Sequence, residues 1–184
     1  MTDTSGFDGF YRSNYRRVVL SLRLATGSTE EAEDLAQEAF ARTLVHWARV
    51  RGGSSPLGYV YRVAFRLQRR RRLRRRRQLD AATDAARLRS TGPVETSSDS
   101  WSDGAAVRHA LAQLPPACRR AAVLCLYADM TAPQAAVVLG VRPSTIRTHV
   151  QRARQALVAT LAPEDHDHRK IEAFTAEERE ALAD

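Results

Sequence analysis

Residues 131–157 read TAPQAAVVLGVRPSTIRTHVQRARQAL, the pattern of a short helix, a tight turn and a longer helix. Thr131 is a favoured N-cap residue, while Gly140 suits a helix end and Pro143 suits the first turn of a new helix. Apolar residues of the longer helix recur at spacings of four, three and four, at Ile146, Val150, Ala153 and Leu157. This periodicity places them on one buried face. The stretch therefore predicts a helix-turn-helix unit, whose second helix typically enters the major groove of DNA.

The opposite face of that longer helix is polar and basic. It carries Arg147, Thr148, Gln151, Arg152 and Arg154, with His149 at its flank. Arg can pair with a guanine edge and Gln with an adenine edge, while Thr can contact a thymine methyl group or a phosphate. We expect His149 to lie near a phosphate. The alternative is a plain helical hairpin with a charged outer face, but residues 104–162 contain seven Arg and a single acid, Asp129, which favours a DNA-reading face.

A second and denser block of basic residues precedes this unit. Residues 57–77 contain ten Arg and no acid, including the run RRRRLRRRR at 69–77, in a chain whose net charge is +8. Like charges at this density repel one another unless a polyanion or counterions neutralise them. The two basic blocks are separated by residues 78–103, which hold two Arg and five acids. This arrangement indicates a protein that contacts one polyanion at two places.

Helical patterns also cover the N-terminal part of the chain. Apolar spacing predicts one helix over about residues 5–25, a second from a capping box at Ser28 to about Ala48, and a third from about Leu57 to Arg77. No stretch shows the alternation of a strand, so we expect an all-α fold. It would comprise two small helical domains, 1–77 and 104–162, joined by a flexible linker at 78–103 and followed by an acidic tail at 163–184.

Several classes of protein are disfavoured by the composition. No apolar run approaches the roughly 18 residues that cross a bilayer, and the N-terminus lacks the features of a signal peptide. Cys118 and Cys125 lie two helical turns apart, too far for a disulfide within one helix. The chain has no Gly-rich phosphate loop and no Cys/His spacing typical of a metal site. We therefore expect neither a catalytic site nor a cofactor nor a bound metal.

Four stretches resemble motifs of one bacterial family. They are EDLAQEAF at 33–40, YVYRVA at 59–64 followed by the Arg run, LPPACRR at 114–120, and LGVRPSTIRTHVQRARQAL at 139–157. In this order they resemble the extracytoplasmic-function (ECF) group of sigma factors of bacterial RNA polymerase. The Arg- and Ala-rich composition, typical of GC-rich genomes, fits an actinobacterial member.

The resemblance implies a role for each motif. The core-polymerase-binding residues would be Asp34, Leu35, Gln37, Glu38 and Phe40. The residues that bind the −10 element, beside the loop 52–56, would be Tyr59, Tyr61, Arg62, Phe65, Arg66, Arg69 and Arg70. The −35 element would be read by Arg147, Thr148, Gln151 and Arg152, with His149 and Arg154 nearer the backbone. The family commonly has Trp at the position of Tyr59 and Asn at that of Arg66, which could alter base choice.

The implied partners are core RNA polymerase, promoter DNA and an anti-sigma protein, in the cytoplasm. Two alternatives remain open from the sequence: a stand-alone helix-turn-helix regulator and an Arg-rich RNA-binding protein. A regulator would bind duplex DNA without polymerase and would not need the Asp34–Phe40 face. The tail 163–184 has eight acids and three basic residues, so a further hypothesis is that it competes with DNA for the basic face of the second domain.

Overall fold

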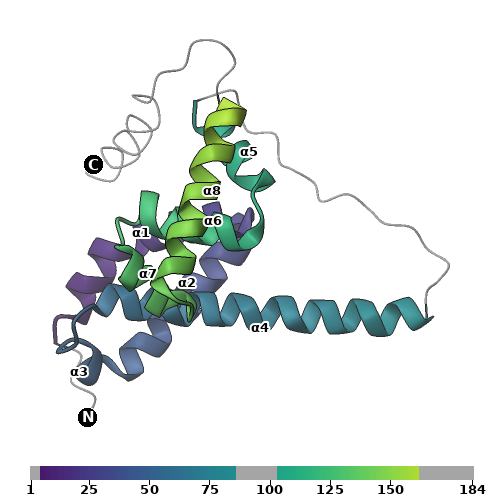
Figure 1. The fold of residues 1–184 in the computed structure, drawn as a ribbon. Coiled ribbons are helices and arrows are strands. Elements are labelled where there is room, and N and C mark those ends of the chain that lie inside the picture. Colours follow the sequence, from purple (N-terminus) through teal and green to yellow (C-terminus); the bar gives the residue numbers. More distant parts are fainter. Residues whose placement is uncertain (1–4, 86–102, 162–184) are drawn as a thin grey trace.

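The computed structural model describes residues 5–85 and 103–161 (Figure 1). Every regular element within those ranges is a helix, which confirms the predicted all-α fold. The tail 163–184 and most of the predicted linker lie outside the described residues. No helix in the described part of the chain is long and apolar enough to cross a membrane.

The first unit contains α1 (Phe7–Thr26), α2 (Thr29–Val45), α3 (Trp47–Val50) and the first half of α4 (Pro56–Ala85). Gly27 ends α1 in the left-handed conformation, with φ 81°. Ser28 caps α2, because its Oγ accepts a hydrogen bond from the Glu31 amide at 3.2 Å. The start of α2 at Ser28 was predicted from the sequence.

The second helix ends earlier than predicted, at Val45 instead of about Ala48. His46 leaves the helical conformation, with φ −109° and ψ 14°, and a short α3 follows. This break turns Trp47 into the core, where its ring packs edge-on against Phe7 at 5.3 Å. The Trp47 Nε1 also donates a hydrogen bond to the Ser5 carbonyl at 2.9 Å. The free energy gained by burying the Trp47 ring therefore exceeds the free energy lost by ending the regular helix three residues early.

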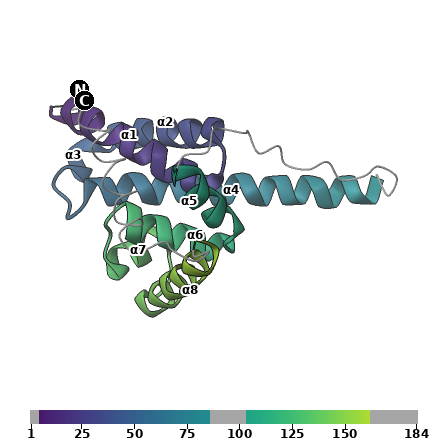
Figure 2. The ribbon, with the colours of Figure 1, turned by 90° about the horizontal axis from the view of Figure 1, so that it is seen from above.

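The helix α4 is longer than predicted. It continues eight residues past Arg77 to Ala85, through QLDAATDA, a stretch without Gly or Pro to end it. The segment lacks an apolar stripe, which is why its sequence reads as a linker. In two views, the distal half of α4 extends away from the rest of the molecule as a single helix (Figures 1 and 2).

The second unit contains α5 (Asp103–Gln113), α6 (Pro116–Ala122), a π-helix η1 (Val123–Tyr127), α7 (Ala132–Leu139) and α8 (Pro143–Leu161). Thr131 and Gln134 form a capping box at the start of α7, and Gly140 ends it with φ 69°. The buried face of α8 includes Ile146, Ala153 and Leu157. The predicted helix-turn-helix is therefore present as α7 and α8.

The two units pack against each other, with α4 between them (Figure 2). On one side of α4 lie α1 and α2, and on the other lies α7. The second unit also contacts α1, where Arg17 Nη2 lies 3.1 Å from Asp129 Oδ2. Asp129 adopts a left-handed backbone with φ 52°, which Asp tolerates better than most residues. The sequence predicted two units but not their contact.

Candidate nucleic-acid and polymerase interfaces

A basic groove lies where the end of α2 and α3 meet the first half of α4. It has a volume of about 450 Å³ and is lined by Arg42, Val45, His46, Arg49, Tyr59, Arg62, Val63 and Arg66. None of these lining residues is acidic. Three residues of the predicted −10 set, Tyr59, Arg62 and Arg66, therefore share one groove. The Nε atom of Arg62 is buried and has no hydrogen-bond partner among the described residues.

A smaller cleft of about 280 Å³ adjoins this groove and lies between the two units. Tyr59, Arg62 and Arg49 line both spaces. The wall on the second unit is formed by α7, through Gln134, Val137 and Val138. The loop before α4 forms another wall with Gly53, Ser54 and Ser55, and Ser55 Oγ accepts a hydrogen bond from the Gly58 amide at 3.0 Å. The loop named from the sequence thus lies beside the basic groove.

Two other residues of the −10 set are part of the core. Tyr61 is fully buried, and its hydroxyl shares a hydrogen bond of 2.7 Å with Ser21 Oγ. Burial raises the pKa of Tyr61 to about 12. Phe65 is 4% exposed and lies beside Tyr61. In this arrangement neither side chain can stack on a base, because α4 is covered on two sides. Tyr61 joins α4 to α1 through Ser21, and Phe65 belongs to the same hydrophobic core.

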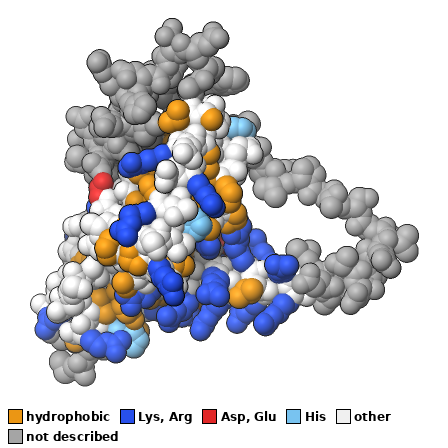
Figure 3. Space-filling view, in the orientation of Figure 1, with side chains coloured by type: hydrophobic (Ala, Val, Ile, Leu, Met, Phe, Trp, Pro, Cys, Tyr) orange, Lys and Arg blue, Asp and Glu red, His pale blue; other side chains and the backbone are white. Residues whose placement is uncertain are grey.

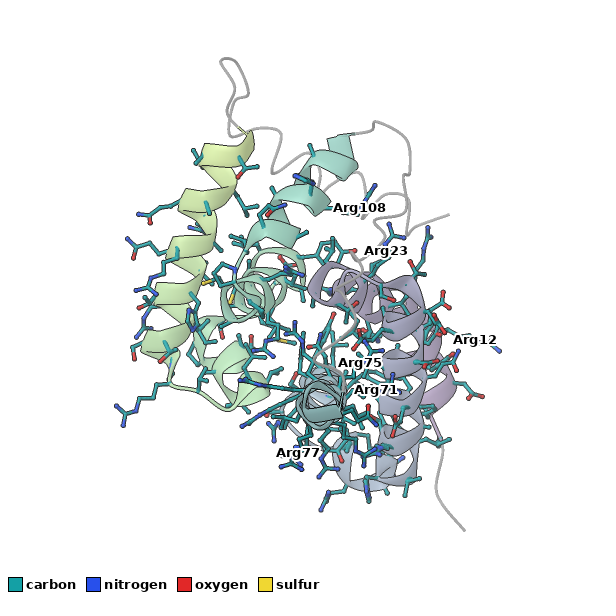
Figure 4. The ribbon with its side chains drawn as sticks, turned by 90° about the vertical axis from the view of Figure 1, so that its right-hand side faces the viewer. Arg12, Arg23, Arg71, Arg75, Arg77 and Arg108 are labelled. Carbon is teal, nitrogen blue, oxygen red and sulfur yellow. The ribbon has the colours of Figure 1, made fainter. Side chains whose placement is uncertain are left out.

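The Arg run divides among the faces of α4. Arg69 and Arg70 of the predicted site are exposed, as are Arg72 and Arg74–Arg77. Arg71 instead lies over α2, with Nη1 at 3.5 Å from Asp34 Oδ2 and Nη2 at 3.4 Å from Glu38 Oε2. Viewed along α4, Arg71 and Arg75 lie on the side that faces α1 and α2, while Arg77 projects on another side (Figure 4).

The exposed face of α8 presents most of the predicted −35 set to solvent. Arg147, Thr148, Gln151, Arg152 and Arg154 are all exposed. Thr148 Oγ1 donates a hydrogen bond to the Ser144 carbonyl at 3.1 Å. Figure 3 shows basic side chains gathered over α8 and along α4 on the same side of the molecule.

His149 differs from its neighbours on α8. It is half-buried, and its Nδ1 lies 3.5 Å from the Sγ atom of Cys118 on α6. Its ring therefore contacts α6, and its place near a phosphate of the −35 element stays a prediction. Cys118 and Cys125 are both free thiols. We assign His149 the role of fixing α8 on α6.

The predicted polymerase-binding set likewise splits between surface and core. Asp34 and Gln37 are exposed and Glu38 is half-buried. Leu35 and Phe40 are 0% and 2% exposed and face the core of the first unit. Glu38 Oε1 also accepts from Arg42 Nη2 at 2.5 Å. The accessible part of this face is therefore a short acidic strip that Arg71 and Arg42 partly neutralise.

Three residues of the basic groove were not found by sequence reasoning. Arg42 lies on α2, His46 at the break between α2 and α3, and Arg49 on α3. All three are outside the sequence motif of α4. Their shared basic character was visible in the sequence, but the break at His46 that turns them toward α4 was not. No group of three or more His, Cys, Asp or Glu residues in the described part of the chain is placed to hold a metal.

Family models match both units of the chain. The one described as Sigma-70 region 2 matches residues 10–78, and the one described as Sigma-70, region 4 matches residues 104–157. The first match covers α1 from Phe10 onward, all of α2 and α3, and α4 as far as Gln78. The second covers α5 to α8 except the last residues of α8.

Curated relatives and a solved structure agree with these matches. The chain is 31% identical over 160 residues to the ECF RNA polymerase sigma factor SigE of Mycolicibacterium smegmatis, covering 85% of this chain and 62% of that protein. It is 27% identical over 183 residues to the RNA polymerase sigma-E factor of Streptomyces coelicolor, covering 100% and 99%. The sigma factor RpoE of Bartonella quintana, solved with the anti-sigma factor NepR, has a similar fold, with a TM-score of 0.68 at 20% identity over 86% of this chain and 98% of that one.

Proposed function

Because the chain belongs to the Sigma-70 family, in its ECF group, we propose that it binds core RNA polymerase and directs it to promoters through a −10 and a −35 element. Sigma factors are non-catalytic subunits of the polymerase, and we assign this chain no chemistry of its own. Its site of action would be the cytoplasm, where the polymerase and the chromosome are.

The observation that carries the proposal is the basic groove beside Tyr59. A single-stranded nucleic acid is held by cationic groups along its backbone and by aromatic rings on which its bases stack. The groove supplies both, with four Arg and one Tyr among its described lining residues and no carboxylate to repel a phosphate. The buried, unpaired Nε of Arg62 is a donor that a base or phosphate would satisfy. A base unstacked from the −10 element fits this description.

The −35 element is assigned to the exposed face of α8. The buried stripe of Ile146, Ala153 and Leu157 fixes the rotation of α8 in its unit, and this orients Arg147 and Gln151 outward together. Arg pairs with guanine and Gln with adenine through two hydrogen bonds each. Arg152 and Arg154, on the same helix, would neutralise phosphates.

Polymerase binding is assigned to the accessible strip of Asp34, Gln37 and Glu38 on α2. Acidic and amide side chains suit a basic helical partner by charge complementarity. Arg71 lies 3.5 Å and 3.4 Å from the two carboxylates, so a basic partner would displace it or share them with it. An anti-sigma protein is a further proposed partner, by analogy with the solved relative, whose structure includes one.

Reading both elements at once requires the two units to separate. Here α7 lies between α4 and α8 and contacts both helices. The basic groove beside α4 and the exposed face of α8 are therefore about two helix diameters apart, roughly 20 Å. Elements two duplex turns apart are separated by roughly 70 Å. In that state residues 86–102 would connect the separated units, between the projecting end of α4 and the start of α5.

The test is gel filtration of the purified chain with core RNA polymerase. We expect the wild type to co-elute, and the double variant Asp34→Arg/Glu38→Arg to lose co-elution because it reverses the charge of the docking strip. The matched control is Asp8→Arg/Glu30→Arg, which reverses the same charge at two exposed acids elsewhere and should co-elute normally. A folded wild type that does not co-elute would contradict the proposal and favour a stand-alone DNA-binding regulator.

A further inference from the structure

The tail 163–184 differs in charge from the rest of the chain. Its sequence is PEDHDHRKIEAFTAEEREALAD, with eight acids, three basic residues and one Phe, at position 174. The tail lies outside the part of the chain that the structure describes. Because the whole chain carries a net charge of +8, an acidic segment attached to it is attracted to the basic surfaces of the two units. The shapes of those surfaces indicate which of them suits the tail.

The basic groove beside Tyr59 is concave and has a volume of about 450 Å³. Four arginines from α2, α3 and α4 line it, and none of its described lining residues is acidic. These arginines are Arg42, Arg49, Arg62 and Arg66. A carboxylate can pair with a guanidinium group through two parallel hydrogen bonds. A groove therefore allows one short acidic segment to contact several guanidinium groups at once.

One hydrogen-bond donor in this groove lacks an acceptor. The Nε atom of Arg62 is buried without a partner among the described residues, and Arg62 lines both the groove and the adjoining cleft. Buried polar groups in native proteins are almost always hydrogen-bonded. A carboxylate or phosphate oxygen that enters the groove would satisfy this donor. The donor therefore favours an anion as the occupant of the groove.

The groove also has an apolar part that matches the one Phe of the tail. Val45 is 67% exposed although it lines the groove, and Tyr59 and Val63 are half-buried beside it. In the tail, Phe174 stands among acids, two residues after Glu172. A segment that combines carboxylates with an aromatic ring suits a groove that combines arginines with Tyr and Val. Single-stranded DNA presents the same combination of negative charge and aromatic rings.

The other basic surfaces suit the tail less well. The arginines of α8 are exposed on the outer face of a helix, as are most of those in the run 69–77 of α4. Such a surface is convex, so an ion pair formed on it stays in water, where solvent and salt weaken the attraction. A groove removes part of that water, and the same charges attract more strongly there. The basic groove is therefore preferred over the face of α8, which the sequence alone suggested.

The tail is also long enough to reach the groove. It follows α8, whose 19 residues are roughly 28 Å long. The face of α8 and the groove lie roughly 20 Å apart. The 22 residues of the tail, when extended, span up to roughly 70 Å, which exceeds both distances together.

We propose that the acidic tail 163–184 docks in the basic groove and competes there with single-stranded DNA. The docking requires neither polymerase nor promoter, whereas the competition rests on the function proposed above for the groove. The apparent affinity of a site falls in proportion to the fraction of the time that the site is open. A docked tail therefore lowers the affinity of the chain for the unstacked −10 strand.

The docking is tested with a fluorescent synthetic peptide of residues 163–184. The host is the tail-neutral variant, defined as the full-length chain with Glu177→Gln/Glu178→Gln/Glu180→Gln, because its own tail competes less with the peptide. We expect saturable binding of the peptide by fluorescence anisotropy. Absence of binding by this folded host at physiological salt would overturn the proposal.

Substitutions in the host locate the peptide. Arg49→Gln and Arg66→Gln should each weaken peptide binding by about tenfold, a typical loss for one charge-assisted contact. Both side chains are exposed, so neither substitution removes a buried contact. The matched control is Arg152→Gln, which removes the same charge from the exposed face of α8 and should change the dissociation constant by less than about twofold. Equal weakening by all three would show diffuse attraction to basic surfaces and would overturn docking in the groove.

The competition is measured with a labelled single-stranded oligothymidylate and the full-length chain at physiological salt. A tail that fills the groove for about nine-tenths of the time weakens DNA binding about tenfold, so the tail-neutral variant should bind about tenfold more tightly than the wild type. The matched control is Asp8→Asn/Glu30→Gln/Glu33→Gln, which makes the same change of net charge at exposed acids of the first unit. We expect this control to alter DNA binding by less than about twofold, because salt screens distant charges.

The two measurements separate the failure of the docking from the failure of the proposed function. If the peptide does not bind but Arg49→Gln still weakens DNA binding, the docking is wrong and the groove remains a site for single-stranded DNA. If the peptide binds and Arg49→Gln weakens it, but the tail substitutions leave DNA binding unchanged, the competition is wrong. In that second case the assignment of the groove to the −10 strand also fails.

Discussion

The helix α8 and the distal half of α4 are both basic, yet they differ in what lies opposite their arginines. In α8 the arginines share the helix with a buried stripe, and Ile146 is 0% exposed. In the α4 run at 69–77 the arginines occupy every position but one, and the exception, Leu73, is 47% exposed. A helix with a buried face has a fixed rotation and can present chosen side chains to base edges. A helix without one can offer only charge, which suits phosphates.

The presence of a buried face in α8 and its absence in distal α4 should have their largest effect on the free energy of unfolding. Ile146→Ala removes a buried side chain and leaves a cavity, so we expect it to lower the free energy of unfolding by about 2–5 kcal/mol. Leu73→Ala removes a side chain that already contacts water, and its effect should stay below about 0.5 kcal/mol. Urea unfolding of both variants measures this. Similar losses in the two would mean that distal α4 is packed against something in solution.

A smaller effect separates the two helices in DNA binding. For the polymerase complex, Arg147→Ala should cost about 1–3 kcal/mol in promoter binding and relax the preference at one base pair of the −35 element. Arg74→Ala should weaken binding equally on every sequence and reduce the slope of log K against log salt by about 0.9. Titrations on matched and base-substituted promoters at several salt concentrations distinguish these results. If the effect of Arg74→Ala depended on the promoter sequence, distal α4 would contact bases as α8 does, and the two helices would not differ in this way.

The smallest effect is expected at the contact between the units that carry the two helices. Arg17 and Asp129 form an ion pair whose side chains are 33% and 56% exposed, so solvent screens it. A double-mutant cycle with Arg17→Gln and Asp129→Asn should give a coupling energy of about 0.2–1 kcal/mol in urea unfolding. A coupling above that range would show that this ion pair is a principal link between the units, more important than the apolar contacts of α7 with α4.

The sequence predicted well the features that depend on neighbouring residues. The caps at Ser28 and Thr131 and the helix end at Gly140 form where they were expected, because each is determined within a few residues. The same holds for α8, whose buried stripe has a regular period.

Features that depend on packing between distant segments were harder to predict. Tyr61 and Phe65 belong to a DNA-binding motif by resemblance, yet both are buried because α4 is covered by α2 on one side and by α7 of the second unit on the other. The apolar periodicity of α4 in the sequence indicates a buried face narrower than the one that α4 has in the structure. The basic groove was only half predicted, because Arg42 and Arg49 reach it through the break at His46.

The central claim, that this chain gives the polymerase its choice of promoter, is tested most directly by run-off transcription on a library of duplexes with randomised upstream sequence. Core polymerase supplemented with the chain should produce transcripts whose templates share two sequence blocks about two duplex turns apart. With Arg147→Ala, the upstream block alone should lose its preference. Templates that are the same with and without the chain would contradict the account.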